Sequence, residues 1–217
     1  AVHDLRGEGV RYPELADSDI GDEAATAEEE KYKSKAGHLA LLIDQLIKIY
    51  VPLSLRGGQP KYAVRGMSLA CMEGERFGLL GINGAGKTTT LSVLTGESVA
   101  SSGEIFIGNE PLSNSLTQRM LGYCPQVDPL LELMTAYETL YFFGRIRGLS
   151  ESVLQQRVNS LVRQTGLLPH AHRPCGTYSG GNKRKLSLAV ALIGDPKVLL
   201  LDEVSSSIAP IAFLYHA

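Results

Sequence analysis

The chain has 217 residues, of which 44% are hydrophobic and 20% are charged, a composition typical of a folded globular protein. A net charge of −2 gives no electrostatic basis for nucleic acid as a partner, and no apolar run approaches the roughly 18 residues that a membrane-spanning helix needs. Three widely separated cysteines argue against a disulfide framework or a zinc site.

Residues 1–37 form a distinct first segment, with ten acidic and five basic residues and few large apolar ones. Such a segment buries too little apolar surface to fold by itself, so we expect a disordered acidic linker here and a folded domain over residues 38–217. Residues 39–51 are expected to form a strand. Residues 63–81 are expected to form two strands joined by a turn at Glu73–Gly74.

Strands and helices alternate over the rest of the chain, with apolar residues at helical spacing and glycines near the helix ends. This alternation predicts an α/β fold with a parallel core sheet and an α-helical stretch over about residues 127–180. The expected helices are 87–95, 135–150, 152–168 and 179–195, and the expected strands are 104–107, 120–126 and 197–203.

The segment Gly81–Thr88 reads GINGAGKT and fits the pattern GxxxxGK[ST] in full. Glycines let backbone N–H groups converge on phosphate oxygens, Lys87 can reach the β- and γ-phosphates, and the Thr88 hydroxyl can reach Mg²⁺. The helix that follows directs the positive end of its dipole at the same anion. A glycine-rich turn can also join a strand to a helix without any ligand, but the expected strand and helix on either side favour nucleotide binding.

A second motif, VLLLDE, ends in two carboxylates. Asp202 follows an apolar strand and is suited to Mg²⁺ coordination through water, opposite Thr88. Glu203 is placed to polarise an attacking water as a general base. An acidic pair at a strand end is a weak signal by itself, and the glycine-rich loop upstream strengthens it.

A third motif, YSGGN, opens an apolar helix. Ser179, Gly180 and Gly181 would form a second anion site at the helix N-terminus. Because the chain already has one phosphate loop, a second site suggests a nucleotide shared with a partner domain. The alternative is a glycine-rich helix cap that has no ligand.

These motifs, in the order GINGAGKTTT, YCPQ, YSGGNKRKLS and VLLLDE, resemble the nucleotide-binding domain of an ABC transporter over about residues 39–203. The surrounding sequence is most similar to subfamily A, the lipid-exporter group, and within it to the second nucleotide-binding domain. The resemblance implies a P-loop NTPase core of mostly parallel sheet with flanking helices, an antiparallel β subdomain and an α-helical subdomain. It also implies ATP and Mg²⁺ as cofactors.

The resemblance assigns roles to individual residues. Gln126 matches the Q-loop glutamine, which contacts metal and water and relays to the membrane domain. Asp202 matches the Walker B aspartate and Glu203 the catalytic carboxylate. The implied metal contacts are Thr88, Gln126 and Asp202, and the implied nucleotide contacts are Gly81, Asn83, Gly84, Ala85, Gly86, Lys87, Thr88, Thr89, Tyr50, Ser179, Gly180 and Gly181.

Two further implied roles concern aromatic and basic residues. Tyr50 matches the aromatic residue that stacks on adenine, with Tyr62 as a rival, and either can instead belong to the core. The basic run Lys183–Lys185 is implied to lie on the exposed face of the signature helix, which argues against a nucleic-acid site there.

After Glu203 the sequence departs from the family pattern. Val204 stands where the family has a proline, and Ala209 stands where it has the D-loop aspartate. The later strand that carries the switch histidine is not matched, and the one alternative is His216, which ends the strand-like IAFLY but comes soon after Glu203. We therefore expect a core that is incomplete at its C-terminal end, without the strand that inserts between the Walker A and Walker B strands. We also expect this chain alone to be a weak or inactive ATPase.

Together, these features predict ATP binding and, in the intact protein, ATP hydrolysis that powers export of lipid-like substrates. The expected partners are a second nucleotide-binding domain, in the same or another chain, and transmembrane domains; nucleic acid is not expected. The expected location is the cytoplasmic face of a membrane. Two alternatives remain, a regulatory module that binds ATP without hydrolysing it and a soluble ABC ATPase of repair or translation.

Overall fold

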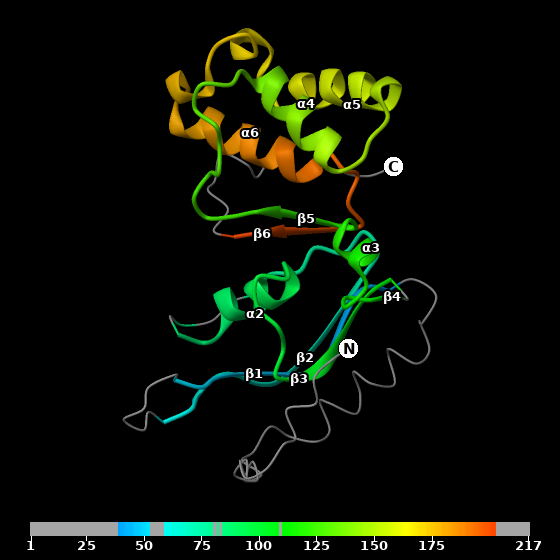
Figure 1. Cartoon of the computed structure of the whole chain (residues 1–217), viewed down its shortest axis with the longest axis vertical. Helices are drawn as coiled ribbons and strands as arrows, with labels where there is room; N and C mark the ends of the chain where they lie inside the picture. Colours follow the sequence, from blue (N-terminus) through cyan, green and yellow to red (C-terminus); the bar gives the residue numbers. More distant parts are fainter. Residues whose placement is uncertain (1–38, 53–58, 80–81, 83, 109, 203–217) are drawn as a thin grey trace. The chain divides into compact units, whose positions relative to one another are not determined.

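The computed structural model describes residues 39–52, 59–79, 82, 84–108 and 110–202. The chain divides into two units, residues 1–36 and 37–217, and all described residues belong to the second. Within this unit, Figure 1 shows two separate β-sheets, with helices α4, α5 and α6 grouped beside the smaller sheet.

The larger sheet has four antiparallel strands in the order β2-β1-β3-β4. Leu41, Ile43 and Leu46 of β1 are all buried, although alternation would place Leu46 on the opposite face from Ile43. The register shifts between Ile43 and Leu46, where Gln45 has a φ of 47°, and this irregularity returns Leu46 to the buried face. The strands are β1 (Leu39–Tyr50), β2 (Lys61–Met72), β3 (Ser102–Ile107) and β4 (Glu110–Pro111).

The smaller sheet consists of two parallel strands, β5 (Leu121–Cys124) and β6 (Val198–Leu201). Within the described ranges, parallel pairing is confined to these two strands. Helix α6 (Gly180–Leu192) packs against β5. Gly122 is required at this contact, because a Cβ there would collide with the backbone oxygen of Ala191 and the ring of Pro196. The expected strands 120–126 and 197–203 are therefore confirmed with shorter bounds.

The prediction of a second strand after the turn at Glu73–Gly74 is wrong over the described residues. Glu75–Leu79, the second half of the predicted strand pair, forms no strand, and Phe77 is 51% exposed. A strand exists only where a neighbouring strand supplies hydrogen-bonding partners, and none of the described strands forms a ladder with this segment. The apolar sequence FGLLG gave no indication of whether such a neighbour is present.

The predicted helices are confirmed, and three short ones were not predicted. A capping box starts α4: the Thr135 hydroxyl accepts from the N–H of Glu138, and the Glu138 carboxylate accepts from the N–H of Thr135. None of the described helices is long and apolar enough to cross a membrane. The helices are α2 (Lys87–Leu94), α4 (Ala136–Ile146), α5 (Glu151–Gln164) and α6, and the unpredicted ones are α3 (Ser115–Gln118) and two 3₁₀ turns (Leu168–His170 and Cys175–Thr177).

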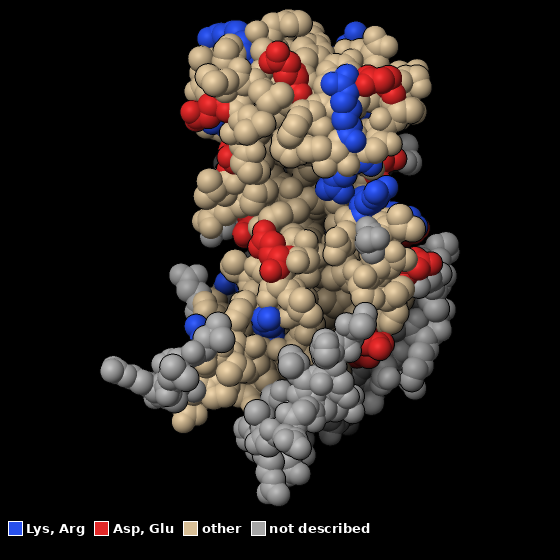
Figure 2. Space-filling model, in the orientation of Figure 1, with Lys and Arg blue, Asp and Glu red and all other residues tan. Residues whose placement is uncertain are grey.

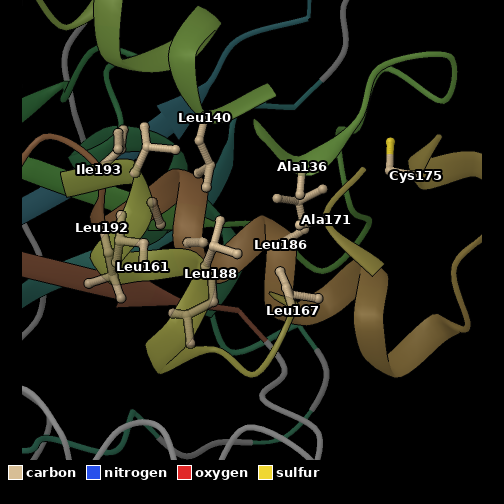
Figure 3. Packing of buried hydrophobic residues seen from close by; sticks show 14 of the residues in the cluster. Ala136, Leu140, Leu161, Leu167, Ala171, Cys175, Leu186, Leu188, Leu192 and Ile193 are labelled. Carbon is tan, nitrogen blue, oxygen red and sulfur yellow. The ribbon is translucent and has the colours of Figure 1, made fainter. Parts of the chain in front are cut away.

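Two hydrophobic clusters hold these elements together. The first joins α4, α5 and α6 to β5, with Leu140, Leu161 and Leu186 among its fully buried side chains (Figure 3). The second joins α2 to both sheets, because Val93 and Leu94 pack with residues of β1 and β3 and with Leu121 and Leu200 of the parallel pair. Burial of this helix fixes the position of the glycine-rich loop that precedes it.

Candidate nucleotide-binding site

The glycine-rich loop leads into α2 through Gly86, which has a φ of 90° and is the N-cap residue. A side chain at this position would place its Cβ 2.5 Å from the carbonyl oxygen of Ala63 in β2, so only glycine fits. The Gly86 carbonyl accepts from the Thr90 N–H (2.8 Å) and the Thr90 hydroxyl (3.0 Å). Because glycine offers no side chain to cap the helix, the N–H groups of its first turn are left for an anion.

Lys87 lies at the first position of α2 and folds back over the loop. Its Nζ donates a hydrogen bond to the carbonyl oxygen of Ile82 (2.9 Å), which also accepts from the N–H of Ala85 (3.1 Å). The ammonium group is therefore held on the side of the helix N-terminus where phosphates would bind. Gly84, Ala85 and Thr88 are exposed and Thr89 is half-buried, whereas Gly81 and Asn83 lie outside the described residues.

The parallel strand pair brings two more predicted residues to a common edge. Cys124 is paired with Leu201, and the N–H of Asp202 donates to the carbonyl oxygen of Cys124 (3.0 Å). Gln126 follows β5 by two residues and Asp202 follows β6 by one, so both lie at the carboxyl ends of their strands. Gln126 is exposed and Asp202 is half-buried. Glu203, the predicted catalytic carboxylate, lies outside the described residues.

The oxygen-bearing side chains of the predicted metal ligands suit Mg²⁺. Among the described residues no group of three or more His, Cys, Asp or Glu side chains could hold a metal ion alone. The predicted set is instead mixed, with the Thr88 hydroxyl, the Gln126 amide oxygen and one carboxylate, Asp202. Mg²⁺ prefers oxygen ligands and is usually bound by one or two carboxylates together with water and substrate phosphates. These residues therefore fit a magnesium ion that arrives with a nucleotide.

The YSGGN motif forms the start of α6. Ser179 is the N-cap residue, and its hydroxyl accepts from the N–H of Asn182 (3.4 Å). Tyr178 is buried, and its hydroxyl donates to the carbonyl oxygen of His170 (2.7 Å), which anchors the motif. Gly180 and Gly181 are exposed, and a Cβ at either position would meet nothing within 4 Å. No contact described within this chain therefore requires glycine at these two positions.

The expectation that Lys183–Lys185 lies on an exposed helix face is wrong. Lys183 pairs with Glu132 (3.1 Å), and Arg184 is only 6% exposed. Arg184 donates to the carbonyl oxygens of Pro125 and Asp202 and to the carboxylate of Asp128 (3.2 Å).

The burial of Arg184 had a signal in the sequence that was missed. Ser187, Leu188 and Ala191 of α6 are also buried, and they follow Arg184 at the i+3, i+4 and i+7 positions of the helix. These positions form one face of the helix, and that face packs into the core. A basic run therefore did not indicate a solvated surface here.

The two candidate adenine-stacking residues lie on neighbouring strands. Tyr50 ends β1 and is 43% exposed, with the Lys48 ammonium 4.9 Å from the centre of its ring. Tyr62 in β2 is half-buried and pairs with Ile49. The greater exposed ring area favours Tyr50 for stacking, and its role stays a prediction.

Two groups beside this edge have raised pKa values. Burial raises the pKa of the Cys124 thiol, whose Sγ lies 3.5 Å from the Ser187 hydroxyl under α6. Burial, followed by the negative charges of Asp202 and Glu97, raises the pKa of Tyr123. Both side chains are therefore neutral near pH 7. All three cysteines of the chain are free, as the sequence predicted.

Together, this loop–helix unit, the carboxyl-end residues of a parallel strand pair and the helical subdomain define an ATP-binding domain of the ABC type. A solved ATP-binding subunit of an ABC transporter superposes with a TM-score of 0.68 at 26% identity, covering 80% of this chain and 70% of that one. The ATP-binding cassette MJ0796, solved as a dimer bound to ADP and phosphate, shares the fold with a TM-score of 0.67 at 22% identity, covering 79% of each chain.

The sequence profile of the ABC transporter family matches residues 64–206, and the chain belongs to this family, in subfamily A. Phospholipid-transporting ATPase ABCA3 of Rattus norvegicus is 46% identical over 174 residues, 79% of this chain. ATP-binding cassette sub-family A member 7 of Mus musculus is 41% identical over 209 residues, 94% of this chain. The chain spans 10% of the first relative's length and 9% of the second's.

Proposed function

We propose that this domain binds ATP with Mg²⁺ and that, in the whole protein, pairs of such domains hydrolyse ATP to drive export of lipid-like substrates. The observation that carries the proposal is the N-terminus of α2, which a glycine opens without a side-chain cap and beside which the Lys87 ammonium is held. A polyphosphate would accept from the N–H groups of this turn and would displace the Ile82 carbonyl as the partner of Lys87. When bound, Mg²⁺ would neutralise charge on the phosphates.

The exposed glycines of α6 support a nucleotide shared between two domains. Gly180 and Gly181 lower helix propensity, and none of the described residues approaches within 4 Å of the positions where their side chains would be. Close approach by a ligand or by another backbone is a common reason for glycine. We infer that the phosphates of a nucleotide held by a second domain meet this helix N-terminus, with the Ser179 hydroxyl as a further contact.

A groove on α4 supports contact with the membrane-spanning part of the transporter. The groove has a volume of about 680 Å³ and is lined mainly by apolar and aromatic side chains, including Tyr141, Phe142 and Ile146. Phe142 and Ile146 are 42% and 63% exposed, and Figure 2 shows broad uncharged areas between the charged side chains of the helical part. We propose that transmembrane domains of the same protein cover this groove. The names of the relatives suggest phospholipid as the transported substrate.

A second candidate function is ATP binding without turnover. The sequence after Glu203 lacks the proline and the D-loop aspartate of the family, which favours this reading for the present chain. Measuring phosphate release beside ATP binding separates the two functions. Tight binding with no release supports the regulatory module, and release that depends on Lys87 supports the ATPase.

Titration of the chain with ATP tests the proposed function. We expect saturable binding that Lys87→Ala abolishes or weakens strongly, because the ammonium contacts the β- and γ-phosphates. Lys183→Ala is the matched control, since this lysine also lies near a helix N-terminus but pairs with Glu132. Equal affinity of the wild type and Lys87→Ala for ATP, or equal losses in the two variants, would refute the proposal.

A further inference from the structure

Arg184 is the most deeply buried charged side chain among those described, and its placement calls for an explanation. Only 8% of the Arg184 side chain is exposed. It pairs with Asp128, whose side chain is 19% exposed. Burial of an ion pair is costly, and well-packed apolar residues of similar volume are often equally or more stable. Stability alone therefore gives no reason for a guanidinium group in the middle of α6.

The hydrogen bonds of Arg184 reach two peptide groups that lie just past the ends of neighbouring strands. One nitrogen donates to the carbonyl oxygen of Pro125, and the other terminal nitrogen donates to the carbonyl oxygen of Asp202. The Pro125 carbonyl belongs to the peptide that precedes Gln126, and the Asp202 carbonyl belongs to the peptide that precedes Glu203. The same side chain therefore holds the backbone directly before two predicted catalytic residues.

The shape of the guanidinium group suits this task. Its planar fork presents donors at fixed relative positions, so it can hold two carbonyl oxygens at a defined separation. The Asp128 carboxylate, 3.2 Å from the first nitrogen, fixes the rotation of the fork. A lysine ammonium is a point charge on a flexible stem and cannot impose the same spacing.

We propose that Arg184 is a positioning residue that sets the spacing between the Gln126 loop and the end of β6, so that Gln126 and Asp202 face the same magnesium–nucleotide complex. The inference rests on the proposed function. Some residues orient a metal ligand without contacting the metal. Removing such a residue typically lowers metal affinity by about 10- to 100-fold. Loss of Arg184 is therefore expected to weaken the part of ATP binding that depends on Mg²⁺, and to leave ATP binding without Mg²⁺ unchanged.

The test measures ATP affinity with Mg²⁺ and with EDTA, and takes the ratio of the two. Arg184→Met combined with Asp128→Leu replaces the ion pair with apolar side chains, so it removes both carbonyl contacts without leaving an unpaired charge in the core. We expect this double variant and Arg184→Lys to lower the ratio by about tenfold or more. Arg157→Lys is the matched control, because Arg157 also binds the Leu192 carbonyl at the end of α6, but its other partner, Asp195, precedes β6 instead of following it.

The possible outcomes separate positioning from stability. Thermal unfolding without nucleotide reports stability, and a variant that unfolds earlier but retains the wild-type Mg²⁺ ratio would show that Arg184 serves packing only. An equal loss of affinity with Mg²⁺ and with EDTA, or a matching loss in Arg157→Lys, would also overturn the inference. Absence of ATP binding by the wild type would refute the proposed function itself, and this inference with it.

Discussion

The backbone N–H of Asp202 lies 3.0 Å from the carbonyl oxygen of Cys124, to which it donates a hydrogen bond one residue beyond the parallel strand pair. This bond continues the β5–β6 ladder up to the residue predicted to bind metal. Since Gln126 follows Cys124 by two residues, the same ladder brings the predicted Q-loop glutamine to that edge. A short parallel pair is thus the framework for two of the three proposed magnesium ligands.

Replacing Gly84 or Gly86 of the phosphate loop by alanine is expected to lower the free energy of unfolding by different amounts. Gly84 and Gly86 have φ values of 88° and 90°, so alanine at either position carries about 1–2 kcal/mol of left-handed strain. At Gly86 the new Cβ also meets the Ala63 carbonyl oxygen, whereas at Gly84 no described atom lies within 4 Å of it. Urea unfolding should show a larger loss of stability for Gly86→Ala than for Gly84→Ala. Equal losses would contradict the assigned loop geometry.

Gly144 in α4 is expected to resist replacement although alanine is the better helix former. A Cβ at Gly144 would collide with Leu154 of α5, which is fully buried. Overpacking of this kind costs about 1–3 kcal/mol, more than the gain of about 1 kcal/mol in helix propensity. We expect Gly144→Ala to lower the free energy of unfolding. Combined with Leu154→Ala it should cost less than the sum of the two single changes, and strict additivity would argue against this contact.

The capping box of α4 predicts a pH dependence of stability. The hydrogen bonds from the Thr135 N–H (2.8 Å) and hydroxyl (2.9 Å) hold the pKa of Glu138 below its usual value. A depressed folded-state pKa means that the stabilisation is complete above the unfolded value of about 4.3 and is lost as the pH falls through the folded value.

Urea unfolding at a series of pH values checks this prediction. The stability difference between the wild type and Glu138→Gln should be largest near neutral pH and should shrink in acid. A difference that does not vary with pH would exclude the capping box as its source.

Tyr50 is expected to recognise the base rather than the phosphates. Stacking on an aromatic side chain contributes about 1–3 kcal/mol per base. Tyr50→Ala should weaken ATP binding by a corresponding factor, Tyr50→Phe should bind nearly normally, and neither should change the affinity for inorganic triphosphate. Titrations of Tyr62→Ala provide the comparison, and a larger loss in that variant would assign the stacking role to Tyr62.

Helices and strands that have local sequence signals could be predicted from the sequence. Helix α4 could be predicted from apolar spacing and from the glycine near its end, and the start of α2 from the glycine-rich motif. The short α3 could not, because four residues carry too little periodicity. The segment Glu75–Leu79 was predicted as a strand from composition, but strand formation depends on a neighbour that composition does not specify.

Arg184 shows the same limit within the candidate site. The family resemblance implied an exposed position for Arg184, whereas its three acceptors come from residues 18 to 59 positions away in the chain. Such a set of partners exists only once β5, β6 and α6 are packed together. The helical spacing could have indicated a buried arginine, but not which carbonyl groups it binds.

Amide hydrogen exchange of the chain with and without ATP, followed by mass spectrometry, tests the central claim most directly. The account predicts slower exchange on ATP addition in peptides that cover residues 84–91, where the loop enters α2, and no change in peptides from α5. Protection that is absent from residues 84–91, or that appears only elsewhere in the chain, would contradict the assignment of this loop as the nucleotide site.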